Sequence, residues 1–262
     1  MKKIFYTLIF LIPVLGLSQE YSTHDLPVIP SLMYGWKNPV EKIEKNISTA
    51  KLFEGSAYDM EYLQMRSHAI IPSKKKTALQ VPDNEEHLLI IKSGTVNISL
   101  KDSSWSIGPG SVAVLMPAAK YSLQNSNSDP TNYFLMRYRS KLPADAKRGK
   151  SSGGSFVKDW NNLEFKAHER GGIRRYFDRA TAMCKRFEMH VTTLKEGMKS
   201  HEPHTHRAEE IILIIDNKTE MQIGDKFYKG GAGDLYYVGS NISHAIRNDG
   251  IGPCTYFAFQ FE

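Results

Sequence analysis

The sequence has 262 residues, 41% of them hydrophobic and 24% charged, which is an ordinary composition for a globular protein. A chain of this length can form one large domain or two of ordinary size, and it can bury a core without a disulfide framework. The formal net charge is +6, but the basic residues are scattered among acidic ones. This distribution argues against an extended basic surface, so we expect no nucleic acid as a partner.

Residues 1–18 have the pattern of a secretory signal peptide. Lys2 and Lys3 precede an apolar run over residues 4–17, and the small residues Gly16 and Ser18 stand where a signal peptidase reads the chain. A membrane anchor is the alternative, but the run is short and interrupted for a bilayer core of about 30 Å. We therefore expect cleavage after Ser18 and export, to the periplasm or outside the cell, with no membrane attachment afterwards.

The chain contains an internal repeat. Sliding the sequence against itself by 123 positions aligns residues 81–138 with residues 204–261 without a gap. Glycine and aromatic positions then coincide: Gly108 with Gly231, Gly110 with Gly233, and Tyr133 with Tyr256. So many coincidences at one offset indicate two copies of one module, which we place at residues 51–140 and 180–262. Residues 19–50 would form an N-terminal extension, and residues 141–179 a linker between the modules.

Each copy consists of short β-type runs separated by turn residues. In the second copy the runs cover residues 186–194, 210–215, 221–223, 235–238 and 256–259, with clusters of Gly, Asn and Asp among the segments that separate them. Many short strands with almost no helical periodicity predict an all-β fold, with an antiparallel sandwich or barrel in each module.

The residue types that carry chemistry gather in the second copy. In an extended chain, residues two apart face the same side, so His204 and His206 can point together into a barrel. Glu210 at the start of the next strand and His244 on a later strand can complete a mixed set of nitrogen and oxygen ligands. Such a set suits manganese, iron, nickel, zinc or copper, and it leaves one or two positions for water or substrate. The alternative is a surface cluster of solvated histidines.

One stretch of the second copy resembles the first motif of the cupin family, G-x5-H-x-H-x3,4-E-x6-G. Gly197, His204, His206 and Glu210 match this motif. The first spacer has six residues in place of five, and Asn217 stands in place of the last glycine.

A later stretch resembles the second cupin motif, G-x5-P-x-G-x2-H-x3-N. Gly233, His244 and Asn248 match in register, while Gly239 and Asn241 replace the proline and the second glycine. By this resemblance the metal ligands are His204, His206, Glu210 and His244.

The first copy lacks this ligand set. At the same offset, its four ligand positions hold Val81, Asp83, His87 and Tyr121. Valine cannot ligate a metal and tyrosine rarely does so, and we therefore expect His87 to be a wall or core residue. The resemblance thus implies two tandem cupin modules, each a jelly-roll β-barrel, of which the first is degenerate and the second binds a metal.

A degenerate cupin followed by a metal-binding one, with the strand over residues 187–191, resembles the (S)-ureidoglycine aminohydrolase-like bicupins. This resemblance makes manganese the first metal to expect, with iron, nickel or zinc as alternatives, and it implies a homodimer or larger oligomer. The family's enzyme holds its metal with a Glu/His/His/Gln set, whereas this chain has a His/His/Glu/His set.

We expect a metal-dependent hydrolase, isomerase or lyase that acts on a small polar substrate bearing a carboxylate. His190 and Glu188 alternate along one strand and are the candidate acid/base residues if that face points inward; an outward, solvated face is the alternative. A non-catalytic cupin that binds a small molecule or a metal is the second hypothesis. The two cysteines, Cys184 and Cys254, either pair or remain buried thiols, because the sequence does not give their separation.

Overall fold

The computed structural model describes residues 26–36 and 40–262, so the predicted signal peptide lies outside the described residues. Strands dominate the described chain, whose helical segments are α1 (Ala146–Ser151) and the short 3-10 helix η2 (Trp160–Asn162). Within these ranges no helix is long and apolar enough to cross a membrane. The expectation of an all-β fold is confirmed.

The first module is built from two sheets. Its strands are β2 (Lys42–Glu44), β3 (Ile47–Gly55), β4 (Met60–Ile70), β5 (Thr77–Gln80), β6 (Glu86–Ser93), β7 (Val96–Leu100), β8 (Ser103–Ile107), β9 (Val112–Leu115), β10 (Lys120–Gln124), β11 (Thr131–Ser140) and β12 (Phe156–Lys158). The larger sheet has the order β12-β9-β6-β11-β4-β3-β2, and the smaller sheet has the order β5-β10-β7-β8.

The second module repeats this plan. Its strands are β1 (Leu32–Tyr34), β13 (Lys166–His168), β14 (Gly171–Arg179), β15 (Phe187–Leu194), β16 (Glu209–Asp216), β17 (Lys218–Ile223), β18 (Lys226–Gly231), β19 (Leu235–Val238), β20 (His244–Asn248) and β21 (Cys254–Phe261). The larger sheet has the order β1-β19-β16-β21-β15-β14-β13, and the smaller sheet has the order β18-β17-β20.

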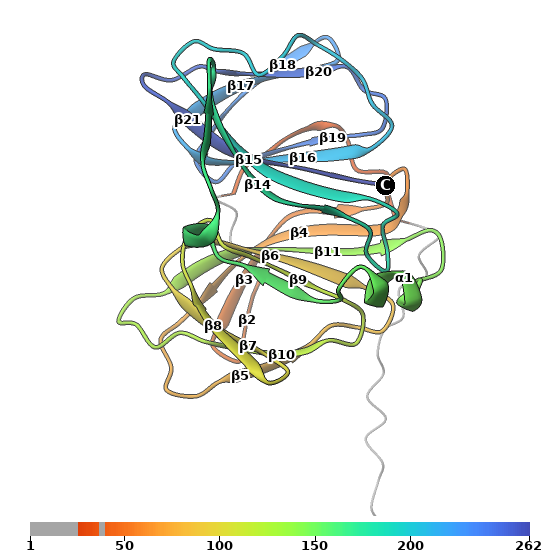
Figure 1. Ribbon diagram of the computed structural model, residues 1–262, viewed down its shortest axis with the longest axis vertical. Helices are drawn as coiled ribbons and strands as arrows, with labels where there is room; N and C mark the ends of the chain where they lie inside the picture. Colours follow the sequence, from red (N-terminus) through yellow and green to blue (C-terminus); the bar gives the residue numbers. More distant parts are fainter. Residues whose placement is uncertain (1–25, 37–39) are drawn as a thin grey trace, which may run out of the picture.

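The two large sheets lie against each other in the middle of the molecule, and each small sheet closes a barrel on the outer side (Figure 1). The largest apolar cluster lies between the large sheets and joins Leu63 of the first module to Phe257 of the second. A separate apolar cluster fills each barrel. Cys184 belongs to the shared core and Cys254 to the second barrel, and both are free buried thiols.

Each module receives one short strand from the chain segment that precedes the other. Strand β1 comes before the first module but pairs with β19 of the second, and β12 comes before the second module but pairs with β9 of the first. Trp36 follows β1 and lies against Gly233, while Trp160 follows β12 and lies against Gly110. The segments expected as an extension and a linker, residues 19–50 and 141–179, thus supply strands to both large sheets.

Two buried glutamates join the modules in the same reciprocal way. Glu86 Oε1 accepts hydrogen bonds from the backbone N–H groups of residues 182 and 183, at 2.7 and 3.2 Å. Glu209, its counterpart in the repeat, accepts from the backbone N–H groups of residues 58 and 59, at 2.7 and 3.3 Å. Both carboxylates are 0% exposed, so these bonds fix how the two large sheets face each other.

Candidate metal centre

The backbone brings the two cupin-like stretches together at one end of the second barrel. His204 and His206 lie on the segment before β16, Glu210 is the second residue of β16, and His244 is the first residue of β20. An isolated antiparallel bridge joins His204 to His244, with N–H to carbonyl distances of 3.2 and 3.0 Å. This bridge places ligands that are far apart in the sequence side by side.

The four residues that the sequence nominates as ligands converge on one point. Glu210 Oε2 lies 2.9 Å from His244 Nε2 and 3.4 Å from His206 Nε2. Ring nitrogens of His204, His206 and His244 all lie within 4.8 Å of one another. Glu210 and His244 are buried, His206 is half-buried and His204 is exposed, so the cluster opens to solvent on the His204 side.

Hydrogen bonds to the backbone fix the orientation of two imidazoles. His206 Nδ1 lies 2.8 Å from the carbonyl oxygen of Ala208, and His244 Nδ1 lies 2.8 Å from that of Ile242. A carbonyl oxygen only accepts, so each Nδ1 carries a proton and each ring turns its Nε2 atom toward Glu210. Histidine ligands of metals are commonly held by such bonds.

The arrangement leaves several acceptors facing one another. The Nε2 atom of His244 is buried and, despite its 2.9 Å approach to Glu210, is not aligned for a hydrogen bond. Lone pairs and a carboxylate at this distance repel one another unless a cation lies between them. The donor set therefore fits a divalent transition metal, held by nitrogen from the histidines and oxygen from Glu210.

The protonation states of Glu210 and His204 are compatible with metal binding. Burial raises the pKa of Glu210, but the imidazoles of His206 and His244 beside it outweigh burial and lower that pKa to about 2. Burial and the neighbouring His201 lower the pKa of His204, so its ring is neutral near pH 7. A carboxylate and a neutral imidazole are the forms that bind metals.

The candidate acid/base residues lie on the same inner face of the barrel. The strand register places Glu188 of β15 opposite Gln260 of β21, and Gln260 opposite Glu210 of β16. Glu188 is therefore two strand spacings, about 10 Å, from the candidate ligand Glu210. His190 Nδ1 lies 2.8 Å from Glu188 Oε1, and the ring turns its Nε2 atom away from that carboxylate. Of the two orientations considered for Glu188 and His190, inward or outward, the structure therefore has the inward one.

Gln260 is a site residue that the sequence reasoning missed. Its Nε2 atom lies 3.4 Å from His206 Nε2 and 3.5 Å from Glu210 Oε1. The signal was present in the alternation along β21, because Gln260 is a polar residue on a face that otherwise carries Tyr256 and Ala258. It lies between the candidate metal ligands and the Glu188–His190 pair.

An ion pair occupies the corresponding place in the first module. Arg137 faces His87 across the sheet as Gln260 faces Glu210 in the second module. The Arg137 guanidinium donates two hydrogen bonds to Glu85, at 2.9 and 3.0 Å, and His87 Nε2 lies 3.4 Å from the same carboxylate. A fixed guanidinium thus supplies the positive charge there, and the described residues contain one candidate metal cluster, the one in the second module.

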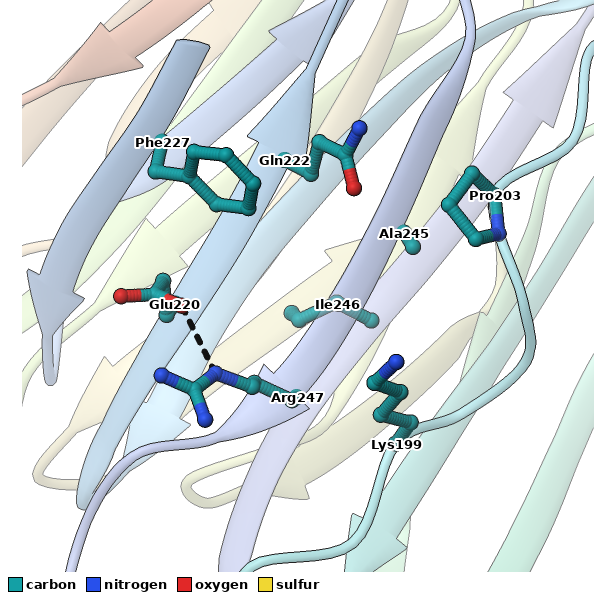
Figure 2. Close-up of a pocket in the computed structure, with 8 residues that line it drawn as sticks. All are labelled: Lys199, Pro203, Glu220, Gln222, Phe227, Ala245, Ile246 and Arg247. Carbon is teal, nitrogen blue, oxygen red and sulfur yellow. Dashed lines mark hydrogen bonds and ion pairs between the residues drawn. The ribbon is translucent and has the colours of Figure 1, made fainter. Parts of the chain in front are cut away.

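A pocket of about 260 Å³ lies on the other side of the strand that carries His244 (Figure 2). Ala245 and Arg247 of β20 line it, and alternation along the strand turns them away from the side on which His244 lies. The Arg247 side chain is held there by a 2.7 Å hydrogen bond to Glu220. This outer pocket is therefore separate from the candidate metal centre.

The comparisons with known proteins agree with this architecture. The family model for the cupin domain matches residues 190–259, which contain all four nominated ligands. No curated protein sequence matches the chain. Among solved structures, oxalate decarboxylase from Lactobacillus farciminis in complex with formate superimposes with a TM-score of 0.67 at 13% identity, over 88% of this chain and 86% of that one.

Two further structures show the same fold. The protein Ylba from E. coli superimposes with a TM-score of 0.65 at 13% identity, over 88% of this chain and 90% of that one. AerE from Microcystis aeruginosa does so with a TM-score of 0.64 at 16% identity, over 87% of this chain and 99% of that one. At these identities the likeness concerns the fold, which covers both modules. Residues 190–259 therefore match the cupin domain, and the chain as a whole has the two-module fold of these structures.

Proposed function

We propose that this protein is an exported, metal-dependent enzyme that acts on a small polar substrate bearing a carboxylate, by hydrolysis, isomerisation or elimination. The observation that carries the proposal is the convergence of three imidazoles and Glu210 at one open end of a barrel. The Glu188–His190 pair, on the same inner face, supports a catalytic role over simple binding.

The residues divide the work as follows. His204, His206, Glu210 and His244 would hold the metal, with manganese the first choice and iron, nickel or zinc as alternatives. A bound divalent metal supplies a Lewis acid that stabilises negative charge on a substrate oxygen. Glu188 orients His190 by accepting the proton of Nδ1, so that Nε2 of His190 can take up or deliver a proton.

Gln260 has a positioning role in this proposal. Its amide donates toward the metal ligands, at 3.4 Å from His206 and 3.5 Å from Glu210, and it separates them from the Glu188 carboxylate. It keeps a second negative charge away from the centre. The carboxylate substrate implied by the name of one structural neighbour, oxalate decarboxylase, is of the size and charge we propose here.

The test is turnover by the metal-loaded protein comprising residues 19–262, followed by NMR on a panel of small hydroxy-, amino- and keto-carboxylates. His190→Gln and Glu188→Gln should keep the metal and lose turnover by about 100-fold or more, as removal of a general acid/base group does. Thr193→Val, on the opposite face of the same strand, is the matched control and should keep full activity. Carboxylate binding to wild type without turnover of any panel member would favour the non-catalytic alternative.

A further inference from the structure

A large cavity opens at the mouth of the first module, the one that lacks metal ligands. It has a volume of about 720 Å³ and lies between the loop over residues 116–120 and the segment that contains α1. By the repeat, this loop corresponds to residues 239–243, which lead into the ligand His244 of the second module. Asp83, at the cavity's edge, takes the place of the ligand His206. The cavity is thus the first module's counterpart of the metal-centre entrance.

The inner wall of this cavity is apolar. Its apolar lining includes Leu100, Met116, Pro117, Ala119, Ala144 and Ala182. Short side chains dominate, which is why so much open volume remains where the chain passes from one module to the next. The volume lies within the range of about 300–1,000 Å³ that is usual for small-molecule sites.

The rim of the cavity is positively charged. Lys101, Lys120 and Lys150 line it, all three are exposed, and Asp83 is the single acidic residue beside them. The three ammonium groups come from three different elements, the turn after β7, the start of β10 and α1. Within the described part of the chain none of the three forms an ion pair, so their charge is available to a ligand.

The loop at the mouth keeps the strained shape of its counterpart. Ala118 has φ of +61°, a left-handed conformation that is unfavourable for alanine, and Asn241 at the equivalent position has φ of +59°. Asparagine tolerates this conformation because its side chain can hydrogen-bond to the local backbone, whereas alanine has no side-chain polar group that could do so. Backbone strain of this kind is concentrated at functional sites.

We propose that the first module binds a small organic anion with an apolar body, an alkyl or aryl carboxylate, in this cavity. The apolar wall would take up the body and the three lysines would pair with the carboxylate. The proposal is independent of the metal centre and of the function proposed for it.

The probe is 8-anilinonaphthalene-1-sulfonate, an anion with an apolar body whose fluorescence rises in apolar surroundings, titrated into the full mature protein. Lys101→Glu, Lys120→Glu and Lys150→Glu should each weaken binding about fivefold to tenfold, the effect of reversing one nearby charge at a solvent-exposed, screened site. Lys147→Glu in the same helix, outside the cavity, is the matched control and should change the affinity less than twofold.

Three further measurements separate this site from others. Octanoate should displace the probe at concentrations where octanol does not. Ala144→Trp, which fills the cavity from an exposed wall without changing the charge, should weaken binding of the probe as well. The double substitution His204→Ala/His206→Ala should leave the probe's affinity unchanged. Equal effects of Lys147→Glu and Lys150→Glu, or equal displacement by octanol and octanoate, would overturn the proposal.

Discussion

The reciprocal glutamates at the module interface allow a quantitative prediction. Each carboxylate accepts two backbone N–H groups from the other module and one tyrosine hydroxyl, from Tyr138 to Glu86 at 2.7 Å and from Tyr237 to Glu209 at 2.5 Å. Replacement by alanine leaves three donors without an acceptor, all of them buried around Glu86 and two of them part-buried around Glu209, at about 1–3 kcal/mol for each buried donor before relaxation. We expect Glu86→Ala and Glu209→Ala each to lower the free energy of unfolding by about 3–5 kcal/mol after local rearrangement and water entry.

Replacement by glutamine should cost much less. At Glu86 the carbonyl oxygen of glutamine can still accept from both backbone N–H groups, and its amide can donate to the oxygen of Tyr138. At Glu209 the carbonyl oxygen can keep the bonds from Tyr58 and Tyr237, and only the 3.3 Å bond from the Asp59 N–H is lost. We therefore expect a loss of about 1 kcal/mol at either site. Burial already raises the pKa of Glu86, which is consistent with a site that tolerates a neutral side chain. Because a domain's whole stability is about 5–15 kcal/mol, the double alanine variant should be largely unfolded.

The assay is urea denaturation followed by tryptophan fluorescence, with Glu164→Ala, an exposed glutamate, as the control. The midpoint should shift in a single transition, since each glutamate holds both modules together. Alanine variants that lose less than about 1 kcal/mol, or that match the glutamine variants, would refute the reasoning.

Three further outcomes follow from the structure. Burial and the cation of Arg66 lower the pKa of His68 to about 3, so its ring stays neutral in the folded protein, whereas in the unfolded chain it takes up a proton below about pH 6.5. The contribution of His68 to stability is therefore complete above that pH and falls by about 2 kcal/mol between pH 7 and pH 5. His68→Gln should remove this part of the loss of stability. Gly233→Ala should cost about 2 kcal/mol or more, because φ is +98° and a Cβ atom would lie 2.5 Å from a ring atom of Trp36, whereas Gly231→Ala, with open space around it, should be nearly neutral in the same thermal melt. Gln260→Ala should reduce turnover more than it reduces metal content, and an equal loss of both would show that it serves the metal instead.

Much of the fold could be predicted from the sequence because the two copies of the repeat align at one offset with almost no gaps. The offset of 123 that aligns Gly110 with Gly233 also places β6 (Glu86–Ser93) on β16 (Glu209–Asp216) and β9 (Val112–Leu115) on β19 (Leu235–Val238). The exchanged strands β1 and β12 could not be found in this way. Each has three residues, too few for an alternation pattern, and each pairs with a strand of the other module that is distant in the chain.

The candidate site likewise has residues that the sequence predicts and one that it does not. His204, His206 and Glu210 are separated by a few residues, so their spacing carries the information, and His244 follows from a second short motif. Gln260 joins them only through the pairing of β21 with β16, a register that no local pattern gives. The same holds for the ion pair between Arg137 and Glu85, which explains how the first module fills the place of the ligands it lacks.

The measurement that tests the central claim most directly is the metal content of the mature protein, residues 19–262, purified without chelators and analysed by plasma mass spectrometry. The account predicts about one transition metal per chain, lost in both His204→Ala and His206→Ala and retained in His168→Ala, a substitution of an exposed histidine on β13. An absence of bound metal in the wild type, even after addition of manganese, iron, nickel and zinc, would contradict it.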